Sequence, residues 1–261
     1  MKKNAKLFGI AAAIAAAALA MAGCDSATGS SNNNINNSPG TPGLVFAGGG
    51  GGTYSVIGIA DTVRGAVVIP AYHNGRPVTS IWNTAFAHNQ WITSVTIGRN
   101  VTRIDQGQGG DRMWGELSHN TTTGAFVRTT SLTSVTFEAG SRLEEIGNNA
   151  FWGASRLTAI DIPAGVTVIG ERAFTSVQLT SVTIPAGVTS IGGHAFTNSS
   201  LTSALTTITI PANVNIEEGP LSGATMGRYG AAFSAFYKDP AGNDSAAGTF
   251  VFADGAWSRQ D

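Results

Sequence analysis

The fold of this 261-residue chain is decided by two adjacent stretches, LTAIDIPAGVTVIGERAFTSVQ at 157–178 and LTSVTIPAGVTSIGGHAFTNSS at 179–200. The two align without a gap, and each carries Leu, Ile-Pro, Val-Thr, Ile-Gly and Ala-Phe at the same offsets. A fixed period of about 20 to 50 residues is typical of a solenoid, in which each repeat forms one coil that stacks on the next. The repeat therefore predicts one continuous stack of coils and favours a binding surface over a catalytic pocket.

The same frame extends in both directions with weaker matches. Upstream, Leu132 and Ile92 open two further copies, and the stretch 67–89 (VVIPAYHNGRPVTSIWNTAFAHN) is another. Downstream, Leu205 opens LTTITIPANVNIEEG, after which the frame is lost. The outer coils of a repeat protein are usually atypical because they cap the stack. We therefore expect a solenoid of about six coils over residues 53–216 and an irregular C-terminal cap over 217–261.

Each coil is expected to be mostly β. Val182-Thr183-Ile184 alternates apolar and polar residues, which is the period of a half-buried strand. Pro185 cannot donate a ladder hydrogen bond and so marks the end of that strand. Residues 188–191 predict a second short strand, and Phe196 should point inward beneath a short helical turn.

The repeat resembles the BspA-like leucine-rich repeats of bacterial surface lipoproteins. The matching signature is L-T-x-V-x-I-P followed by V-T-x-I-G-x-x-A-F, and the resemblance covers roughly residues 53–216. It implies a non-enzymatic protein that binds noncovalently, through adhesion to glycoproteins of a host or of neighbouring cells. The ligand would be a protein or a glycoprotein.

The N-terminus predicts export and a lipid anchor. Three lysines precede an apolar run over residues 7–20, which is typical of a signal peptide and short for a membrane span. Met-Ala-Gly-Cys at 21–24 is similar to a bacterial lipobox, so residues 1–23 would be removed and Cys24 would carry the lipids. The stretch 24–52 is rich in Ser, Asn, Gly and Pro and reads as a flexible tether. We expect the protein at the outer membrane or cell surface.

Charge and motifs disfavour other functions. The chain has 15 basic and 16 acidic residues, and loss of the signal peptide removes three lysines and no acids. The resulting net charge is −4, and no basic stripe remains in the sequence that could bind nucleic acid. No metal-binding spacing of histidines, no cofactor motif and no nucleophile elbow occurs in the sequence. His194, in the variable pair before Ala-Phe, is expected on a solvated rim.

One coil carries an insertion. After Ile104-Asp105 the expected Ala-Phe arrives only at 125–126, so that residues near 106–122 should form a loop. Insertions in repeat proteins often lie on the binding face, and Trp, Met and Arg are enriched in interface cores. The candidate binding residues of this loop are Arg112, Met113, Trp114, Glu116 and His119. The alternative is a tolerated insertion whose Trp114 packs over the edge of the coil.

The outward strand face is a second candidate surface. Thr93, Thr133, Thr158, Thr180 and Thr206 should share one column, and Thr96, Thr136, Asp161, Thr183 and Thr209 another. Threonine suits exposed strand positions, so these columns also fit a purely structural role. Two other functions stay open: a periplasmic or envelope scaffold, and a glycan-active enzyme, which would require two carboxylates within about 10 Å in one cleft.

Overall fold

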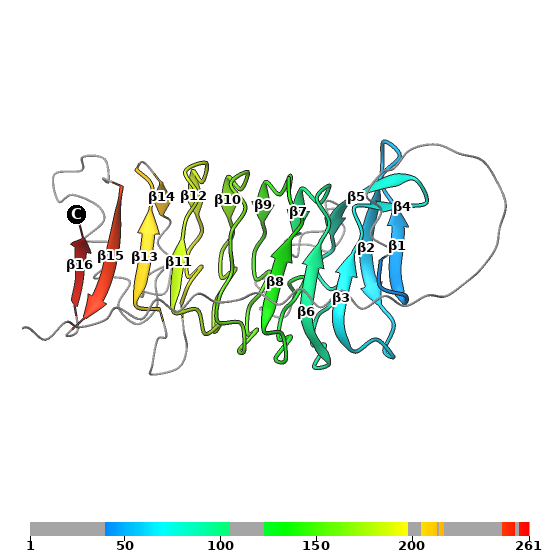
Figure 1. Ribbon diagram of the computed structural model, residues 1–261, viewed down its shortest axis with the longest axis horizontal. Coiled ribbons are helices and arrows are strands. Elements are labelled where there is room, and N and C mark those ends of the chain that lie inside the picture. Colours follow the sequence, from blue (N-terminus) through cyan, green and yellow to red (C-terminus); the bar gives the residue numbers. More distant parts are fainter. Residues whose placement is uncertain are drawn as a thin grey trace, which may run out of the picture. The chain divides into compact units, whose positions relative to one another are not determined.

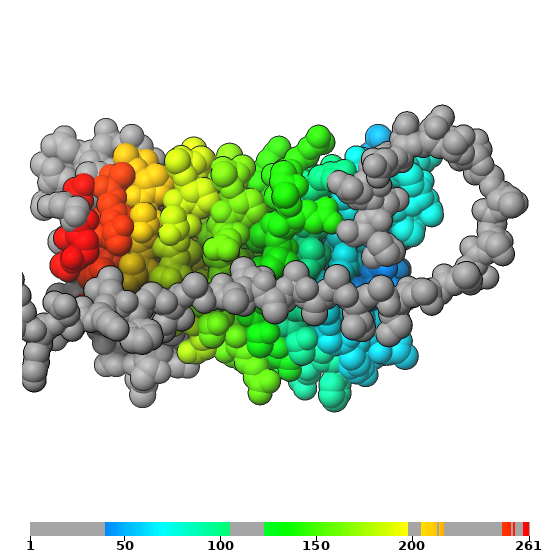
Figure 2. Space-filling view, viewed as in Figure 1, coloured from blue at the N-terminus to red at the C-terminus, as the bar shows by residue number. Residues whose placement is uncertain are grey.

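The computed structural model describes residues 40–104, 123–197, 205–212, 214–216, 247–253 and 256–260, and these residues form strands and turns without a helix. The strands are β1 (Leu44–Gly48), β2 (Tyr54–Ile59), β3 (Gly65–Ile69), β4 (Tyr72–His73), β5 (Arg76–Ile81), β6 (Ile92–Ile97), β7 (Arg103–Ile104), β8 (Ser134–Phe137), β9 (Glu145–Ile146), β10 (Val168–Ile169), β11 (Ser181–Thr183), β12 (Ser190–Ile191), β13 (Thr207–Ile210), β14 (Asn215–Ile216), β15 (Gly248–Ala253) and β16 (Ala256–Gln260). Successive coils lie side by side in sequence order, as Figures 1 and 2 show. The predicted solenoid is confirmed.

One face of the solenoid is a continuous sheet with the strand order β1-β2-β5-β7-β9-β10-β12-β14. From β2 onward its strands are parallel, since each coil returns the chain to the same edge. One isoleucine of each coil falls in register with the next, and all of them are buried. They are Ile81, Ile104, Ile146, Ile169, Ile191 and Ile216.

The opposite face carries two separate sheets, β3-β6-β8 and β11-β13-β15-β16. Between β8 and β11 lies the segment Ala159–Ile162, which occupies the strand position of its own coil. Among the described residues, the backbone of this segment makes no hydrogen bond to either neighbouring coil. The sheet on this face is therefore interrupted in the middle of the stack, while the sheet on the other face is not.

A column of stacked phenylalanines fills the third side of the core. Phe86, Phe126, Phe151, Phe174 and Phe196 lie with neighbouring ring centroids 4.8 to 5.4 Å apart and interplanar angles of 9° or less. The predicted inward position of Phe196 is confirmed, because its residue is only 4% exposed.

The turns that carry these rings are not helical. The amide of Phe151 donates to the carbonyl of Ala173, and that of Phe174 donates to the carbonyl of Ala195, at 2.8 and 2.7 Å. These bonds connect coils, whereas in a helix the same amides would donate to carbonyls of the same segment. The expectation of helical turns is thus replaced by a third ladder of bonds between coils.

Glycine lets the coils approach closely after the buried isoleucines Ile169 and Ile191. A Cβ placed on Gly170 would lie 2.5 Å from the amide nitrogen of Asn148, and one on Gly192 would lie 2.4 Å from that of Glu171. The Ile-Gly step of the repeat is therefore a packing requirement.

The ends of the stack differ from the rest. Strand β1 lies within the stretch expected as a tether and pairs antiparallel with β2, so the sheet begins at Leu44 instead of residue 53. At the other end β15 pairs antiparallel with β13, and β16 pairs with β15. Both antiparallel additions bring residues from outside the repeat frame onto a strand edge, which limits edge-to-edge aggregation.

Candidate binding surface

The residues singled out from the sequence lie outside the described part of the chain. This holds for Cys24 and for the loop residues Arg112, Met113, Trp114, Glu116 and His119. The described residues on either side of the insertion are Ile104, at the end of β7, and Thr123. The chain thus enters the insertion from the continuous sheet, next to the Ile81–Trp82 step of the preceding coil.

The threonine columns are present and face solvent. Thr93, Thr133, Thr158, Thr180 and Thr206 are all exposed. The hydroxyl of Thr133 donates to the carbonyl of Thr93, and that of Thr206 to the carbonyl of Thr180. Because these hydroxyls donate hydrogen bonds to neighbouring coils, the columns contribute to stacking as well as to the surface.

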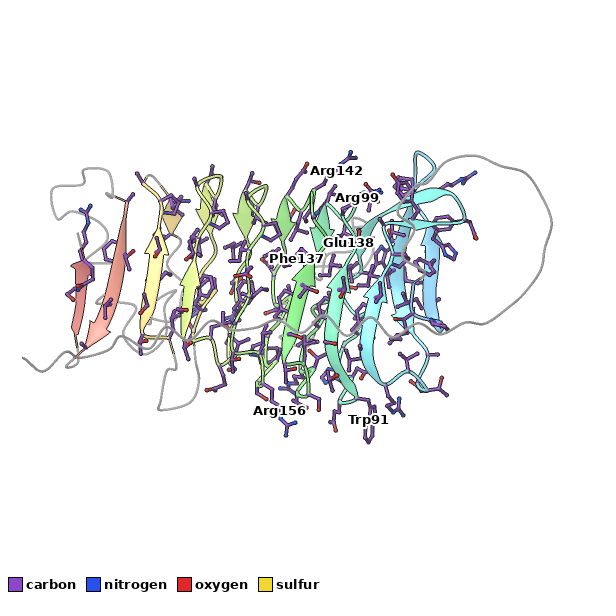
Figure 3. The ribbon with its side chains drawn as sticks, viewed as in Figure 1. Trp91, Arg99, Phe137, Glu138, Arg142 and Arg156 are labelled. Atoms are coloured by element: carbon purple, nitrogen blue, oxygen red, sulfur yellow. The ribbon has the colours of Figure 1, made fainter. Side chains whose placement is uncertain are left out.

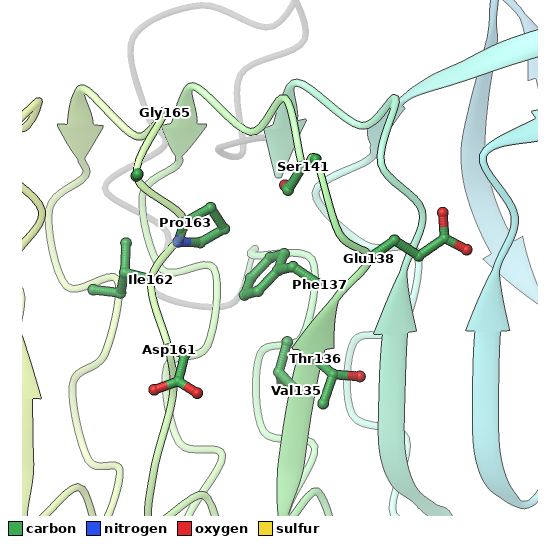
Figure 4. Close-up of a pocket in the computed structure, with 11 residues that line it drawn as sticks. Val135, Thr136, Phe137, Glu138, Ser141, Asp161, Ile162, Pro163 and Gly165 are labelled. Carbon is green, nitrogen blue, oxygen red and sulfur yellow. The ribbon is translucent and has the colours of Figure 1, made fainter. Parts of the chain in front are cut away.

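The second column is broken at Asp161, where the sheet is also broken. A cavity of about 480 Å³ separates β8 from residues 161–165, and a second of about 340 Å³ separates Ala159–Ile162 from β11. Phe137 stands where other coils have isoleucine, and its ring points toward Ile162 and Pro163 (Figure 4). Phe137 is bulkier than isoleucine, and the turn between it and Leu143 is two residues longer than the turn between Ile184 and Val188.

Two carboxylates, those of Glu138 and Asp161, line the larger cavity. The Glu138 carboxylate points away from Asp161 in Figure 4 and accepts a hydrogen bond from the backbone amide of Arg99 at 3.0 Å. This pair does not converge on a common point, as general acid and base catalysis of glycoside cleavage would require.

A third feature lies at the edge formed by the turns before β6. Trp91 is 59% exposed, the most exposed large apolar side chain among the described residues, and it projects from this edge in Figure 3. It borders a recess of about 420 Å³ that runs between the turn 58–64 and the turn 84–91. We refer to this feature as the Trp91 recess. Its polar lining residues are Asp61, Arg64, Thr84, His88, Asn89 and Gln90.

The ring of Trp91 is held in place from both sides of the recess. The guanidinium of Arg64 lies over the indole, 4.7 Å from its centroid, and donates to the backbone carbonyls of Asp61 and Val63. The side-chain oxygen of Asn89 accepts from the backbone amides of Trp91 and Ile92, at 2.9 and 3.0 Å. Arg64 therefore packs on the ring of Trp91, and Asn89 holds the backbone of the turn that carries it.

The opposite edge of the solenoid carries two arginines, Arg99 and Arg142 (Figure 3). The Arg99 guanidinium lies 5.9 Å from the ring centroid of Tyr72. A hydrogen bond from Asn100, then one from Arg99 and the positive charges of both arginines, lower the pKa of Tyr72 below its ordinary value of 10.0. This edge carries two arginines beside Glu138, whereas the Trp91 recess pairs one acid with one base.

Sequence reasoning missed the Trp91 recess. Trp91 precedes the first apolar residue of its coil, where other coils have Ser131, Arg156 and Gln178. A tryptophan at a position otherwise filled by polar residues was the available signal, but its partner Arg64 comes from the preceding coil. The expectation for His194 was wrong: it is 9% exposed, in left-handed conformation, with its Nε2 buried.

The described ranges contain no group of three or more His, Cys, Asp or Glu residues placed to bind a metal ion. Nor does this part of the chain hold a helix of the length and apolarity needed to cross a membrane.

Comparison with known proteins identifies the repeat. Residues 119–223 match the BspA type leucine rich repeat region, in six copies. This part of the chain is therefore a BspA-type leucine-rich repeat region, as the signature in the sequence predicted. No curated protein matches the chain.

One solved structure shows a similar fold, and two others are more weakly similar. A leucine-rich repeat protein from Bacteroides ovatus is 24% identical with a TM-score of 0.52, and the match covers 66% of this chain and 40% of that one. The leucine rich repeat protein of T. pallidum is 25% identical with a TM-score of 0.48, and the match covers 58% of this chain and 63% of that one. A leucine rich cell surface protein from Faecalibacterium prausnitzii is 26% identical with a TM-score of 0.40, and the match covers 68% of this chain and 55% of that one. The chain thus spans less than two thirds of each of these three structures.

Proposed function

We propose that this chain is an exported bacterial lipoprotein whose solenoid binds a protein or glycoprotein ligand noncovalently at the cell surface. Positions 1–24 begin with basic residues, continue with an apolar run and end in small residues before Cys24. This order supports export and lipidation at Cys24. The BspA-type repeats supply a rigid scaffold for a binding surface.

The observation that carries the binding role is the exposure of Trp91. Leaving a large aromatic side chain 59% exposed forgoes stabilisation that burial would bring. Tryptophan and arginine are the residue types most enriched where interfaces gain their affinity, and here Trp91 and Arg64 are already in contact. A surface that is ordered before binding loses less entropy when a ligand arrives.

The insertion supplies a second proposed contact through Arg112, Met113, Trp114, Glu116 and His119. Replacement of Trp114 by Ala should weaken ligand binding and lower the melting temperature by no more than a few degrees. A large loss of thermal stability would instead make Trp114 a packing residue.

Location is tested in intact cells. The wild-type chain should incorporate radiolabelled palmitate and a Cys24→Ala variant should not. Protease added outside the cells should degrade the solenoid while a periplasmic control protein survives. Full protection until the outer membrane is opened would overturn the adhesive role and favour an envelope scaffold.

Binding is tested with purified chain on a panel of immobilised extracellular glycoproteins. Trp91→Ala should reduce binding about tenfold or more, as expected for an interface residue of this type. Trp82→Ala is the matched control, because Trp82 is 49% exposed in the preceding coil and does not line the recess. Equal losses in both variants, or no binding by the wild type, would contradict the proposal.

A further inference from the structure

We infer that the Trp91 recess is a carbohydrate site that takes one neutral hexopyranose unit of a glycan. The inference rests on the proposed binding function and names the chemical group that the surface recognises. It draws on the shape, charge and hydrogen-bonding groups of the recess.

The recess offers an aromatic surface beside polar groups, which is the combination that a sugar ring needs. A pyranose has an apolar side made of C–H groups and a rim of hydroxyls. The polarised C–H groups are attracted by the negative face of an aromatic ring. The part of the Trp91 ring that Arg64 does not cover is available for this contact, since the residue is 59% exposed.

The hydroxyls would find both acceptors and donors in the recess. Among the described residues, the carboxylate of Asp61, the side-chain nitrogen of Asn89 and the amide of Gln90 are not engaged in hydrogen bonds within the protein. A carboxylate accepts two hydroxyl protons, and a carboxamide both donates and accepts. Adjacent hydroxyls of one sugar can therefore be bound from the Asp61 turn and the Asn89 turn together.

The charge of the recess selects against anionic ligands. Asp61 and Arg64 carry opposite charges and lie on the same turn, so their charges largely offset each other in the recess. The cationic side chains Arg99 and Arg142 lie at the opposite edge (Figure 3). A sulfated or carboxylated sugar would gain more there than beside Asp61.

Size and lining argue against a peptide side chain as the occupant. A volume of about 420 Å³ lies in the range of small-molecule sites, which is about 300 to 1,000 Å³. Polar residues make up half of the lining, whereas a pocket for an apolar side chain would be lined mostly by apolar groups.

The test uses the full purified chain on an array of neutral and anionic oligosaccharides. The wild type should bind neutral glycans that end in glucose, galactose, mannose or their N-acetyl derivatives. Trp91→Ala and Asp61→Asn should each reduce the signal about tenfold, and Trp91→Phe should retain part of it. Trp82→Ala should stay within about twofold of wild type, and all variants should keep the wild-type melting temperature within a few degrees.

Three results would overturn the inference. They are an array without a bound neutral glycan, exclusive binding of sulfated or carboxylated glycans, and equal loss in Trp82→Ala. Enzymatic deglycosylation separates this inference from the proposed function. If a glycoprotein stripped of its glycans binds as tightly as the intact one and binding still needs Trp91, the proposed function stands and the sugar site fails.

Discussion

The rings of Phe151 and Phe174 lie parallel, with centroids 5.4 Å apart and planes 6° from each other, in the middle of a five-membered column. Both residues are fully buried. The spacing of this pair equals the step from one coil to the next, so that each ring fills the space above its neighbour. The column thus couples the stability of each coil to that of the coils on either side.

Replacement of Phe151 by Ala should destabilise the whole described stack by about 3 to 5 kcal/mol, because it opens a cavity between two rings. Chemical denaturation monitored by circular dichroism measures the effect. Trp91→Phe, at the exposed edge, serves as the control and should change stability little. A loss below about 1 kcal/mol for Phe151→Ala would mean that the column does not couple the coils.

Gly192→Ala should destabilise the protein by about 1 to 3 kcal/mol, because the added methyl group overpacks the space between two coils. Its Cβ would lie 2.4 Å from the amide nitrogen of Glu171, an atom of the backbone that cannot rotate away. Gly48→Ala is the matched control, since a Cβ at Gly48 meets no atom within 4 Å. Thermal unfolding of the two variants should show a marked decrease for the first alone.

The interruption of the sheet at Ala159–Ile162 should be visible in hydrogen exchange. Amides of Ile160 and Ile162 should exchange at least about tenfold faster than those of Thr167 and Gly170 in the same coil. Thr167 and Gly170 donate to Glu144 and Ile146 on the continuous face, at 2.8 and 2.7 Å. Comparable protection on both faces would show that the sheet is closed in solution.

Phe137→Ile tests the cause of that interruption. Isoleucine occupies the same strand position at Ile97 and Ile210, and both of these residues pair with a neighbouring strand. The smaller side chain should let residues 159–162 approach β8 and slow the exchange of their amides. If exchange is unchanged, the longer turn after β8 and not the Phe137 ring keeps the coils apart.

The pKa of Tyr72 predicts a dependence of stability on alkaline pH. Because the hydrogen bond from Asn100 and the contacts with Arg99 favour the phenolate, the folded pKa lies below the unfolded value of 10.0. The resulting stabilisation is complete above pH 10.0 and is lost as pH falls through the folded pKa. The stability of wild type relative to Tyr72→Phe should therefore increase as pH rises toward 10.0.

Difference titration of the phenolate absorbance, wild type minus Tyr72→Phe, reports the Tyr72 proton directly. Asn100→Ala should move this titration back toward 10.0. A difference curve already centred at 10.0 in wild type would contradict the contacts of Tyr72 with Asn100 and Arg99.

The sequence by itself determined the solenoid, its two short strands per coil, the inward phenylalanine and the exposed threonine columns. These follow from features repeated at a fixed offset, because a residue type that recurs in every coil faces the same environment in every coil. Helical turns were expected wrongly, since the hydrogen bonds that replace them, such as Phe151 to Ala173, connect residues 22 positions apart.

The tertiary structure alone decided the features that differ between coils. Arg64 and Trp91 are 27 positions apart and meet only because consecutive coils stack in register. Likewise, the opening beside Ala159–Ile162 is defined by how that coil packs against β8. A repeat pattern specifies the residues and contacts that all coils have in common. A binding site, in contrast, is formed by residues that differ between two neighbouring coils, and packing between the coils decides which of these residues meet.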